Sequence, residues 1–262
     1  MGNYIHLKNR VAVISDIHGN LRALNAVLEE IEREQVDHIV VCGDVAAGPF
    51  PSETINRLMK LGELTSFVCG NSDREIVAAY DSQQPVNIKE EDHAFLIASW
   101  CANQIDSNQR DFLANFSDRV VMKISDFGKV LFCHGSPRSD MEMITMFTPE
   151  TDLIRMLSGV EENVVACGHT HHQFDRNVEP YRVINVGSVG MPYEGIPAAF
   201  WALIGPDVEL RMTEYDAKGT ADEAVSADYP DPTYSETILE PPGPEEVARY
   251  FEQVAAERGE RG

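Results

Sequence analysis

The stretch VAVISDIHGN, residues 11–20, joins four apolar residues to an acid and an imidazole that lie two positions apart. A short, continuous apolar run such as Val11 to Ile14 is typical of a buried strand. The Gly19-Asn20 pair breaks that pattern, and apolar residues then recur at helical spacing. This stretch therefore predicts a strand followed by a helix, with Asp16 and His18 at the carboxyl end of the strand. The helical residues are Leu21, Leu24, Leu28 and Ile31.

The same arrangement occurs twice more in the first third of the chain. Ile39 to Cys42 is a second apolar run and precedes Gly43-Asp44, and Ser66 to Cys69 is a third and precedes Gly70-Asn71. Strands that alternate with helices are typical of βαβ units and of a mainly parallel sheet.

The later part of the chain has more strands and fewer helices. Residues 120–124 and 130–133 flank a turn and predict a hairpin that ends at His134, and residues 164–167 precede Gly168-His169-Thr170-His171. We expect the strands at 164–167, 181–186, 198–204 and 208–212, which have few helices between them, to form a second, more antiparallel sheet. The predicted fold class is α/β, a four-layer α-β-β-α sandwich of two mixed sheets flanked by helices.

Two further regions complete the predicted organisation. A helical insert is expected at about 87–118, because apolar residues there recur on one helical stripe. We therefore predict one main domain over residues 1–215 that includes this insert. Residues 216–262 form an acidic C-terminal extension, in which 244–256 predict an amphipathic helix and the preceding segment is expected to be irregular.

Each apolar run ends in a potential metal ligand. The carboxyl ends of strands in open α/β sheets converge on one crevice, so these segments can meet. In extended chain, residues i and i+2 face the same way, which would direct both members of each closely spaced pair into one cavity. Carboxylates, imidazoles and an amide without thiolates suit Mn, Fe or Zn. The predicted ligands are Asp16, His18, Asp44, Asn71, His134, His169 and His171.

The order of these ligands resembles the five-block signature of the calcineurin-like metallophosphoesterases. The Gly-rich block at 185–192 is similar to that of their small bacterial and archaeal phosphodiesterase-like branch. The resemblance implies two divalent ions. One would be held by Asp16, His18, Asp44 and His171, and the other by Asp44, Asn71, His134 and His169. Asp44 would bridge the two ions. The resemblance also implies in-line attack on phosphorus by a metal-bridging hydroxide, with Asp44, Asn71 and His134 as the catalytic residues.

One position departs from the family pattern. Many members have a histidine after Gly-Asn that protonates the leaving oxygen, whereas this chain has Ser72 followed by Asp73. A proton donor is typically worth about a hundredfold or more in rate, so diesters and activated esters should suffer less than alkyl monoesters. Asp73, His172 or a metal-bound water could replace the acid, although Asp73 could instead be a helix-initiating acid and His172 a solvent-facing residue. The candidate substrate contacts are Asn71, Ser72, Arg74, Arg138 and His172, and surface ion pairing is the alternative for the two arginines.

The composition of the chain indicates which classes of binding partner and which cellular location to expect. A formal net charge of −22 disfavours duplex nucleic acid and anionic membranes, so we expect a small phosphoester or nucleotide substrate. Five cysteines without C-x-x-C pairs, and the absence of a leader or spanning segment, predict a cytoplasmic protein with reduced thiols. The alternatives are a protein Ser/Thr or dinucleoside-polyphosphate phosphatase on the same scaffold, a non-catalytic metal-binding interaction module, and a mononuclear zinc hydrolase. The oligomeric state is not predicted.

Overall fold

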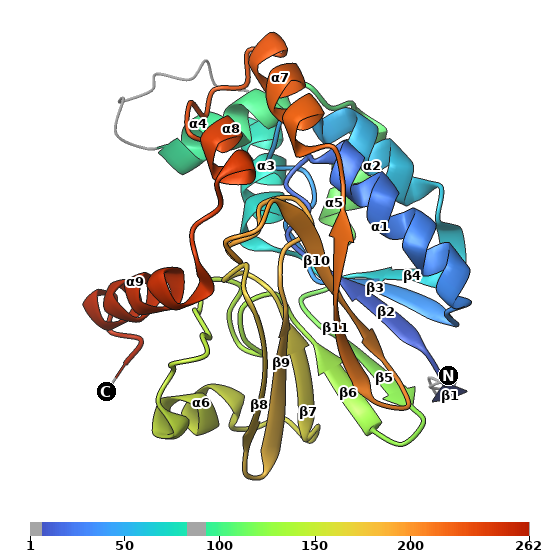
Figure 1. Cartoon of the computed structure of the whole chain (residues 1–262), viewed down its shortest axis with the longest axis vertical. Helices are drawn as coiled ribbons and strands as arrows, with labels where there is room; N and C mark the ends of the chain where they lie inside the picture. The colour runs from blue at the N-terminus through green and yellow to red at the C-terminus, as the bar shows by residue number, and fades with distance from the viewer. Residues whose placement is uncertain (1–6, 83–92, 262) are drawn as a thin grey trace.

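The computed structural model describes residues 7–82 and 93–261 and contains two mixed sheets (Figure 1). The five-stranded sheet has the order β11-β10-β2-β3-β4, and β2, β3 and β4 are parallel. Antiparallel β10 pairs with β2, and β11 pairs with β10. The bounds are β2 Val11–Ile14, β3 His38–Val41, β4 Thr65–Phe67, β10 Ala198–Ile204 and β11 Val208–Glu214.

The six-stranded sheet has the order β1-β5-β6-β7-β9-β8. The predicted hairpin is β5 and β6, which are antiparallel, whereas β6, β7 and β9 are parallel to one another. The bounds are β1 Leu7–Lys8, β5 Val120–Ile124, β6 Gly128–Phe132, β7 Val164–Cys167, β8 Gln173–Val178 and β9 Tyr181–Val186. The half-polar strand β8 and the short β1 were not predicted from the sequence.

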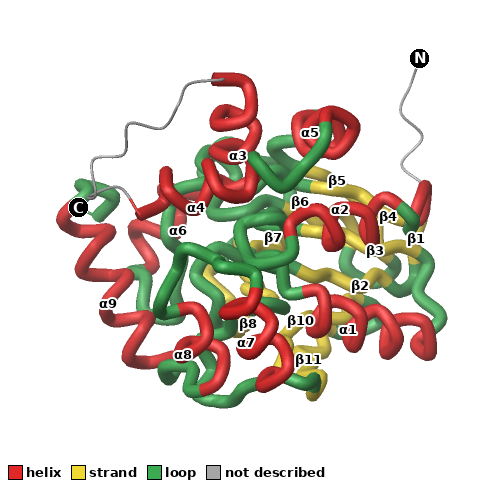
Figure 2. Tube along the Cα trace, turned by 90° about the horizontal axis from the view of Figure 1, so that it is seen from above, coloured by secondary structure: helices red, strands yellow, loops and turns green. Residues whose placement is uncertain are grey.

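Helices surround the strands (Figure 2). They are α1 Leu21–Glu34, α2 Pro51–Met59, α3 Asn71–Ser82, α4 His93–Ala102, α5 Ser107–Ala114, α6 Glu150–Leu157, α7 Ala217–Ser226, α8 Tyr234–Leu239 and α9 Pro244–Glu257, with a short 3₁₀ helix at Gly62–Leu64. Helices α4 and α5 lie in the predicted insert, of which residues 87–92 fall outside the described residues. None of the described helices combines the length and the apolar character that a membrane span requires.

Three apolar clusters separate four layers, which confirms the predicted fold class. Ala12 and Ile14 of β2 pack toward the helices that cover the five-stranded sheet, whereas Val11 and Val13 pack between the two sheets. A third cluster lies between the six-stranded sheet and α6, and contains Leu131 and Leu153. Strand β2 is therefore buried on both faces, and this is why its sequence is continuously apolar rather than alternating.

The expected assignment of 198–204 and 208–212 to the second sheet is wrong. Ala202 lies opposite Val13 in an antiparallel pairing, so β10 and β11 extend the first sheet. All seven residues of β10 are buried. Such a pattern shows that a strand is covered on both faces, but it does not show which strand is its neighbour.

The segment before the last helix is also more ordered than expected. It forms α7 and α8, and α7 lies against α1 from the other end of the chain (Figure 1). Ala221, Ala224, Tyr234 and Ile238 form a small buried cluster. Its alanine-rich stripe gives little apolar contrast along the sequence, so the periodic signal is weak.

Candidate metal centre

The seven predicted ligands follow the carboxyl ends of five strands, and the structure brings them together. Asp16 and His18 follow β2, Asp44 follows β3, and His134 follows β6. Asn71 begins α3 shortly after β4, and two further histidines follow β7. In both sheets these strand ends point to the same crevice, which is the expected location of a site in an open α/β fold.

Two groups of ligand atoms are compact enough to hold a metal ion each. The potential ligand atoms of Asp16, His18 and His171 lie within 4.8 Å of one another, and so do those of Asp44, His134 and His169. Asn71 joins the second group, because its Oδ1 lies 3.2 Å from Nε2 of His134. The structure therefore contains two candidate metal-ligand groups side by side.

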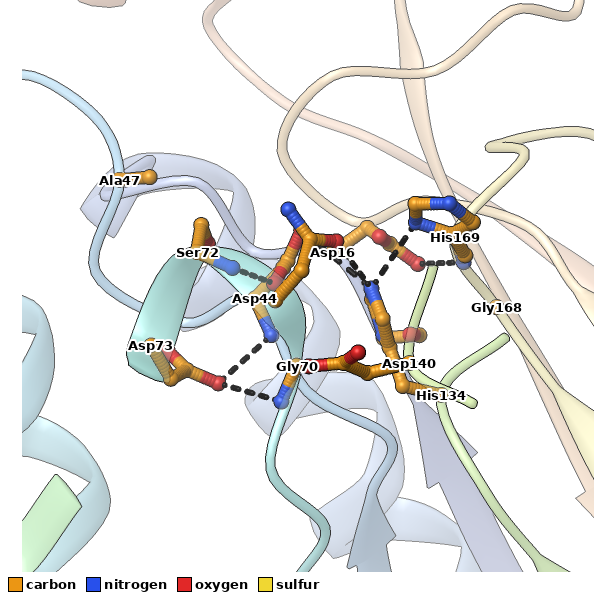
Figure 3. Close-up of polar contacts among 12 residues, drawn as sticks. Asp16, Asp44, Ala47, Gly70, Ser72, Asp73, His134, Asp140, Gly168 and His169 are labelled. Atoms are coloured by element: carbon orange, nitrogen blue, oxygen red, sulfur yellow. Dashed lines mark hydrogen bonds and ion pairs between the residues drawn. The ribbon is translucent and has the colours of Figure 1, made fainter. Parts of the chain in front are cut away.

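Asp44 lies between the two groups. Its Oδ2 is 3.4 Å from Nε2 of His134 in one group and 3.9 Å from Nε2 of His18 in the other. Its Oδ1 accepts a hydrogen bond of 2.9 Å from the backbone N–H of Ser72, which fixes the orientation of the carboxylate (Figure 3). This is the position that a carboxylate shared by two cations requires.

Three of the histidines direct a lone pair into the centre. Nδ1 of His18 lies 3.0 Å from the carbonyl of Ala47, and Nδ1 of His171 lies 2.7 Å from that of Met191. Nδ1 of His134 is likewise 2.7 Å from a backbone carbonyl, that of Cys42. A carbonyl only accepts, so each Nδ1 carries a proton, and Nε2 of the neutral ring presents a lone pair to the centre.

These lone pairs face other acceptors. Nε2 of His18 and Nε2 of His171 are only 3.1 Å apart, and the buried Oδ1 of Asp16, 3.1 Å from the latter nitrogen, has no hydrogen-bond partner. Buried acceptors left without a donor are destabilising. A divalent cation between these atoms would satisfy them together, so the donor set fits a pair of metal ions.

The charges in the centre are strongly coupled. Burial alone would raise the pKa of Asp16 and of Asp44, but the neighbouring imidazoles outweigh burial and lower both. Burial alone would lower the pKa of His134, but the adjacent Asp44 carboxylate raises it to about 10. Burial, with the charge of His134, lowers the pKa of His169 to about 4. A metal ion binds the neutral imidazole, so metal binding at His134 should be accompanied by release of a proton.

The ligand loops do not have the extended backbone expected from the i and i+2 spacing. Positive φ angles occur at Asp16 (53°), His18 (46°), Asp44 (53°), His169 (66°) and His171 (56°). Left-handed backbone at a residue other than glycine costs on the order of 1–3 kcal/mol and is concentrated at functional sites. The paired ligands do meet, but the reason is this left-handed turn rather than strand geometry.

Hydrogen bonds between the loops hold the strained backbone in place. The N–H of Asp16 donates to the carbonyl of Gly43, and the N–H of His18 donates to the carbonyl of Asp44, both at 3.0 Å. From the Gly-rich block, Ser188 Oγ donates to the carbonyl of Asp16 at 2.7 Å, and Asn185 Nδ2 donates to the carbonyl of Gly168 at 2.7 Å. Asn185 and Ser188 therefore support the ligand loops.

Neither candidate for the replacement acid faces the centre. The carboxylate of Asp73 is fully buried and accepts backbone hydrogen bonds from Asp44 at 2.8 Å and from Gly70 at 3.0 Å (Figure 3). It also accepts a hydrogen bond of 2.9 Å from the backbone N–H of Val45. Burial and the charge of Asp44 raise its pKa to about 7. Its bonds show that it fixes two ligand loops relative to each other, and a proton donor for the substrate would have to face the opposite way.

The expectation that His172 contacts substrate is wrong. Its ring is fully buried, Nδ1 lies 2.8 Å from the carbonyl of Thr170, and Nε2 accepts from the N–H of Met146 at 3.3 Å. Burial lowers its pKa to about 4. His171 and His172 are adjacent in sequence, but their side chains point in different directions, so the His172 ring lies outside the centre.

Two pockets flank the centre. The arginine pocket has a volume of about 510 Å³ and is lined by Cys69, Arg74, Arg119, His134, Arg138 and Asp140. Arg74 is paired with Asp140 at 2.8 Å, and Arg138 is paired with Glu142. These guanidinium groups border the site, but they already have carboxylate partners, as the surface-pairing alternative predicted.

The second pocket, the extension pocket, has a volume of about 320 Å³. It is lined by His18, Asn71, Ser72, Tyr193, Tyr229 and Asp231, among others. Ser72 is 8% exposed there, and its Oγ has no hydrogen-bond partner. Sequence reasoning did not identify Tyr193, Tyr229 or Asp231. The only local signal was the position of Tyr193 directly after the Gly-rich block.

Glu75 is a further residue that the sequence did not reveal. It lies one helical turn after Asn71 on α3 and accepts a hydrogen bond from the Asn71 side chain. Because the amide nitrogen donates to Glu75, the amide oxygen is left to face His134. The i and i+4 spacing of the two residues was the signal that could have found this contact.

Comparison with known proteins agrees with this geometry. A model of the calcineurin-like phosphoesterase superfamily domain matches residues 10–204. An uncharacterized protein of Methanocaldococcus jannaschii is 27% identical over 244 residues, which cover 86% of this chain and 96% of that protein.

Two solved structures are similar in fold. A metallophosphoesterase from Sphaerobacter thermophilus has a TM-score of 0.70 and 24% identity over 88% of this chain and 98% of its own. A hypothetical protein from Pyrococcus horikoshii OT3 has a TM-score of 0.76 and 22% identity over 89% and 98%. Since the family model covers residues 10–204, about three quarters of the chain, and includes every candidate ligand of the two groups, the chain belongs to the calcineurin-like phosphoesterase superfamily.

Proposed function

We propose that the chain is a dinuclear metal-dependent phosphodiesterase that acts on a small phosphoester or a nucleotide. The observation that carries the proposal is the pair of ligand groups that share Asp44, in which buried acceptors face one another without donors. Asp16, His18, Asp44 and His171 would hold one ion, and Asp44, Asn71, His134 and His169 the other. The ligand chemistry favours Mn, Fe or Zn.

When bound, two divalent cations neutralise phosphoryl oxygens and lower the pKa of water enough for hydrolysis at neutral pH. The protein residues supply the positioning. Asp44 is oriented by the N–H of Ser72, Asn71 is oriented by Glu75, and His134 is oriented by the carbonyl of Cys42. We propose these three ligands as the catalytic residues. Hydrolysis would proceed by direct in-line attack, without a phosphorylated enzyme.

The preference for diesters follows from the residue after Asn71. Ser72 has no side chain that can donate a proton to an alkoxide near neutral pH, and Asp73 and His172 point elsewhere. Phosphodiesters with activated leaving groups need that proton less than alkyl monoesters do. Its unpartnered Oγ supports Ser72 as a substrate contact, and Arg74 and Arg138 border the same centre.

The alternatives differ in substrate or in class. A protein Ser/Thr or dinucleoside-polyphosphate phosphatase would use the same ligands and act on monoesters or anhydrides. A non-catalytic interaction module is disfavoured by the complete ligand set, and a mononuclear site is disfavoured by the position of Asp44 between two groups. We also propose a main domain over 1–215 with an extension over 216–262. A cytoplasmic location is supported by five cysteines that are all free.

A substrate panel tests the proposal. Bis-p-nitrophenyl phosphate, p-nitrophenyl phosphate and a dinucleoside polyphosphate are compared after chelation and after Mn²⁺, Fe²⁺ or Zn²⁺ is added back. The diester should have the highest kcat/KM, and activity should return only with metal. Full activity in the chelated protein, or a monoester rate well above the diester rate, would contradict the proposal.

A further inference from the structure

The extension pocket is built partly from residues outside the domain that carries the ligands. One wall is the metal centre, at His18, Asn71 and His171, and a second wall is formed by α3 and α4. Tyr229, Asp231 and Thr233, in the segment that connects α7 to α8, close the pocket. The C-terminal extension therefore contributes directly to the space beside the candidate metals.

Asp231 gives this pocket an acidic character. Its side chain is only 6% exposed, and its Oδ1 accepts hydrogen bonds from the N–H and the hydroxyl of Thr233 at 2.9 and 2.7 Å. No described residue donates to Oδ2. Glu75 adds a second carboxylate, and the described lining contains neither lysine nor arginine. An anionic group would be repelled here, whereas a cation would find unused acceptors.

A displaceable donor already approaches Asp231. Nε2 of His93, at the start of α4, lies 3.6 Å from Oδ1, and the imidazole side chain is 56% exposed. An exposed side chain can rotate away at little cost, and it would leave the buried carboxylate to a ligand. The imidazole thus marks the place where an N–H group of a ligand would bind.

Two tyrosines form the aromatic part of the pocket. Tyr193 is stacked on the ring of His171, with centroids 4.8 Å apart and planes at 23°. Tyr229 packs edge to face against Trp100 and against Tyr234, with both centroid distances 5.3 Å. Both rings are held rigidly by these contacts. Aromatic rings beside carboxylates are the combination that recognises organic ammonium groups.

Ser72 connects this pocket to the reaction centre. Its N–H is bonded to Asp44, while its buried Oγ is unpartnered and borders the pocket. A hydroxyl in that position can bond to an ester oxygen of a substrate whose phosphate lies at the metals and whose organic group lies in the pocket.

We propose that the extension pocket binds an alkylammonium group on the alcohol-derived substituent of the phosphodiester, with Asp231 as the counter-charge. This inference rests on the proposed function and deepens it. It makes the C-terminal extension the element that determines specificity. It also makes the two sides of the centre unequal, because guanidinium groups line the arginine pocket and none lines the described part of the extension pocket.

The test uses three p-nitrophenyl phosphodiesters whose second alcohol is ethanolamine, propan-1-ol or glycolate, so that size is nearly constant while charge changes. The metal-loaded, full-length protein should show kcat/KM for the ammonium diester roughly tenfold or more above that for the neutral one, since a hydrogen bond to a charged partner is worth that much. The glycolate diester should be slowest. Equal rates, or a preference for glycolate, would overturn the proposal without any variant.

Asp231→Asn keeps an oxygen for the bonds from Thr233 and removes only the charge. It should abolish the preference for the ammonium diester by raising the KM for that diester. Asp228→Asn is the matched control, because Asp228 is exposed in the same segment. A preference that persists in Asp231→Asn, or is lost equally in the control, would assign the selectivity elsewhere.

Binding provides a second readout. Titration calorimetry with 2-aminoethyl methylphosphonate and its 2-hydroxyethyl analogue should give tighter binding of the amine in the parent protein and equal binding in Asp231→Asn. If none of the diesters is hydrolysed, the proposed function fails, and this titration still decides the pocket. If the diesters are hydrolysed but the amine binds no better than the alcohol, only the pocket assignment fails.

Discussion

Asp44→Asn should remove both metals while leaving the fold intact. The Oδ2 of Asp44 is 3.4 Å from one imidazole of the second group and 3.9 Å from one of the first, so both cations would lose the same negative charge. A pair of unit charges about 4 Å apart interacts by about 4 kcal/mol at an effective dielectric constant of 20. For a divalent ion the loss is at least that large, which corresponds to roughly a thousandfold weaker binding at each site.

The substitution is otherwise conservative. Asn retains the oxygen that accepts from the N–H of Ser72, and Asn tolerates the left-handed backbone at this position, where φ is 53°. Asp126→Asn is the matched control, because Asp126 also has a positive φ of 70° but lies in the exposed β5–β6 turn.

The assays are metal content after dialysis, hydrolysis of bis-p-nitrophenyl phosphate, and the circular dichroism of the metal-free proteins. The Asp44→Asn variant should retain little metal and little activity with an unchanged spectrum, and the Asp126→Asn variant should match the parent. Two equivalents of metal and the parent rate in Asp44→Asn would refute the bridging role of Asp44.

Three further changes have defined outcomes. Ser72→His should raise kcat for p-nitrophenyl phosphate and alkyl monoesters by up to about a hundredfold and change diester rates much less, whereas equal gains would argue against the missing-acid account. Gly168→Ala would place a Cβ 2.3 Å from Oδ2 of Asp16, so it should lower the free energy of unfolding in urea by about 1–3 kcal/mol and weaken metal binding. Gly243→Ala is the control and should change neither quantity, because the space around Gly243 is open. Burial, with the charge of a nearby lysine, lowers the pKa of His38 in the folded state. As pH falls, the unfolded chain therefore takes up this proton before the folded chain does, and the free energy of unfolding decreases below about pH 6.5. The urea midpoint of His38→Gln should therefore fall less than that of the parent between pH 7.5 and 5.5. An equal fall in both proteins would show that other groups cause the pH dependence.

The location of the candidate ligands at strand ends could be predicted from the sequence because the signal is local. An apolar run that stops at Asp16, at Asp44 or at His134 shows both that a strand ends and that a polar group lies at its end. General rules of α/β topology then bring the strand ends together. The order of the layers could be predicted from the same apolar runs, since the pattern of each run shows whether one or both faces of the strand are covered.

What could not be predicted depends on contacts between distant residues. The pairing of Ala202 with Val13 depends on how the two sheets pack against each other. The sequence of β10 alone does not indicate which strand it pairs with. The left-handed backbone at Asp16 and His171 is imposed by hydrogen bonds from other loops. The burial of His172 and the placement of Asp231 beside the centre likewise arise only after the chain has folded.

Anomalous diffraction from crystals grown with Mn²⁺ tests the central claim most directly. Two peaks should appear in the crevice, one bordered by Asp16, His18 and His171, the other by Asn71, His134 and His169, with a carboxylate oxygen of Asp44 in contact with both. One peak alone, or no peak at saturating Mn²⁺ with Fe²⁺ and Zn²⁺ crystals equally empty, would contradict the dinuclear centre.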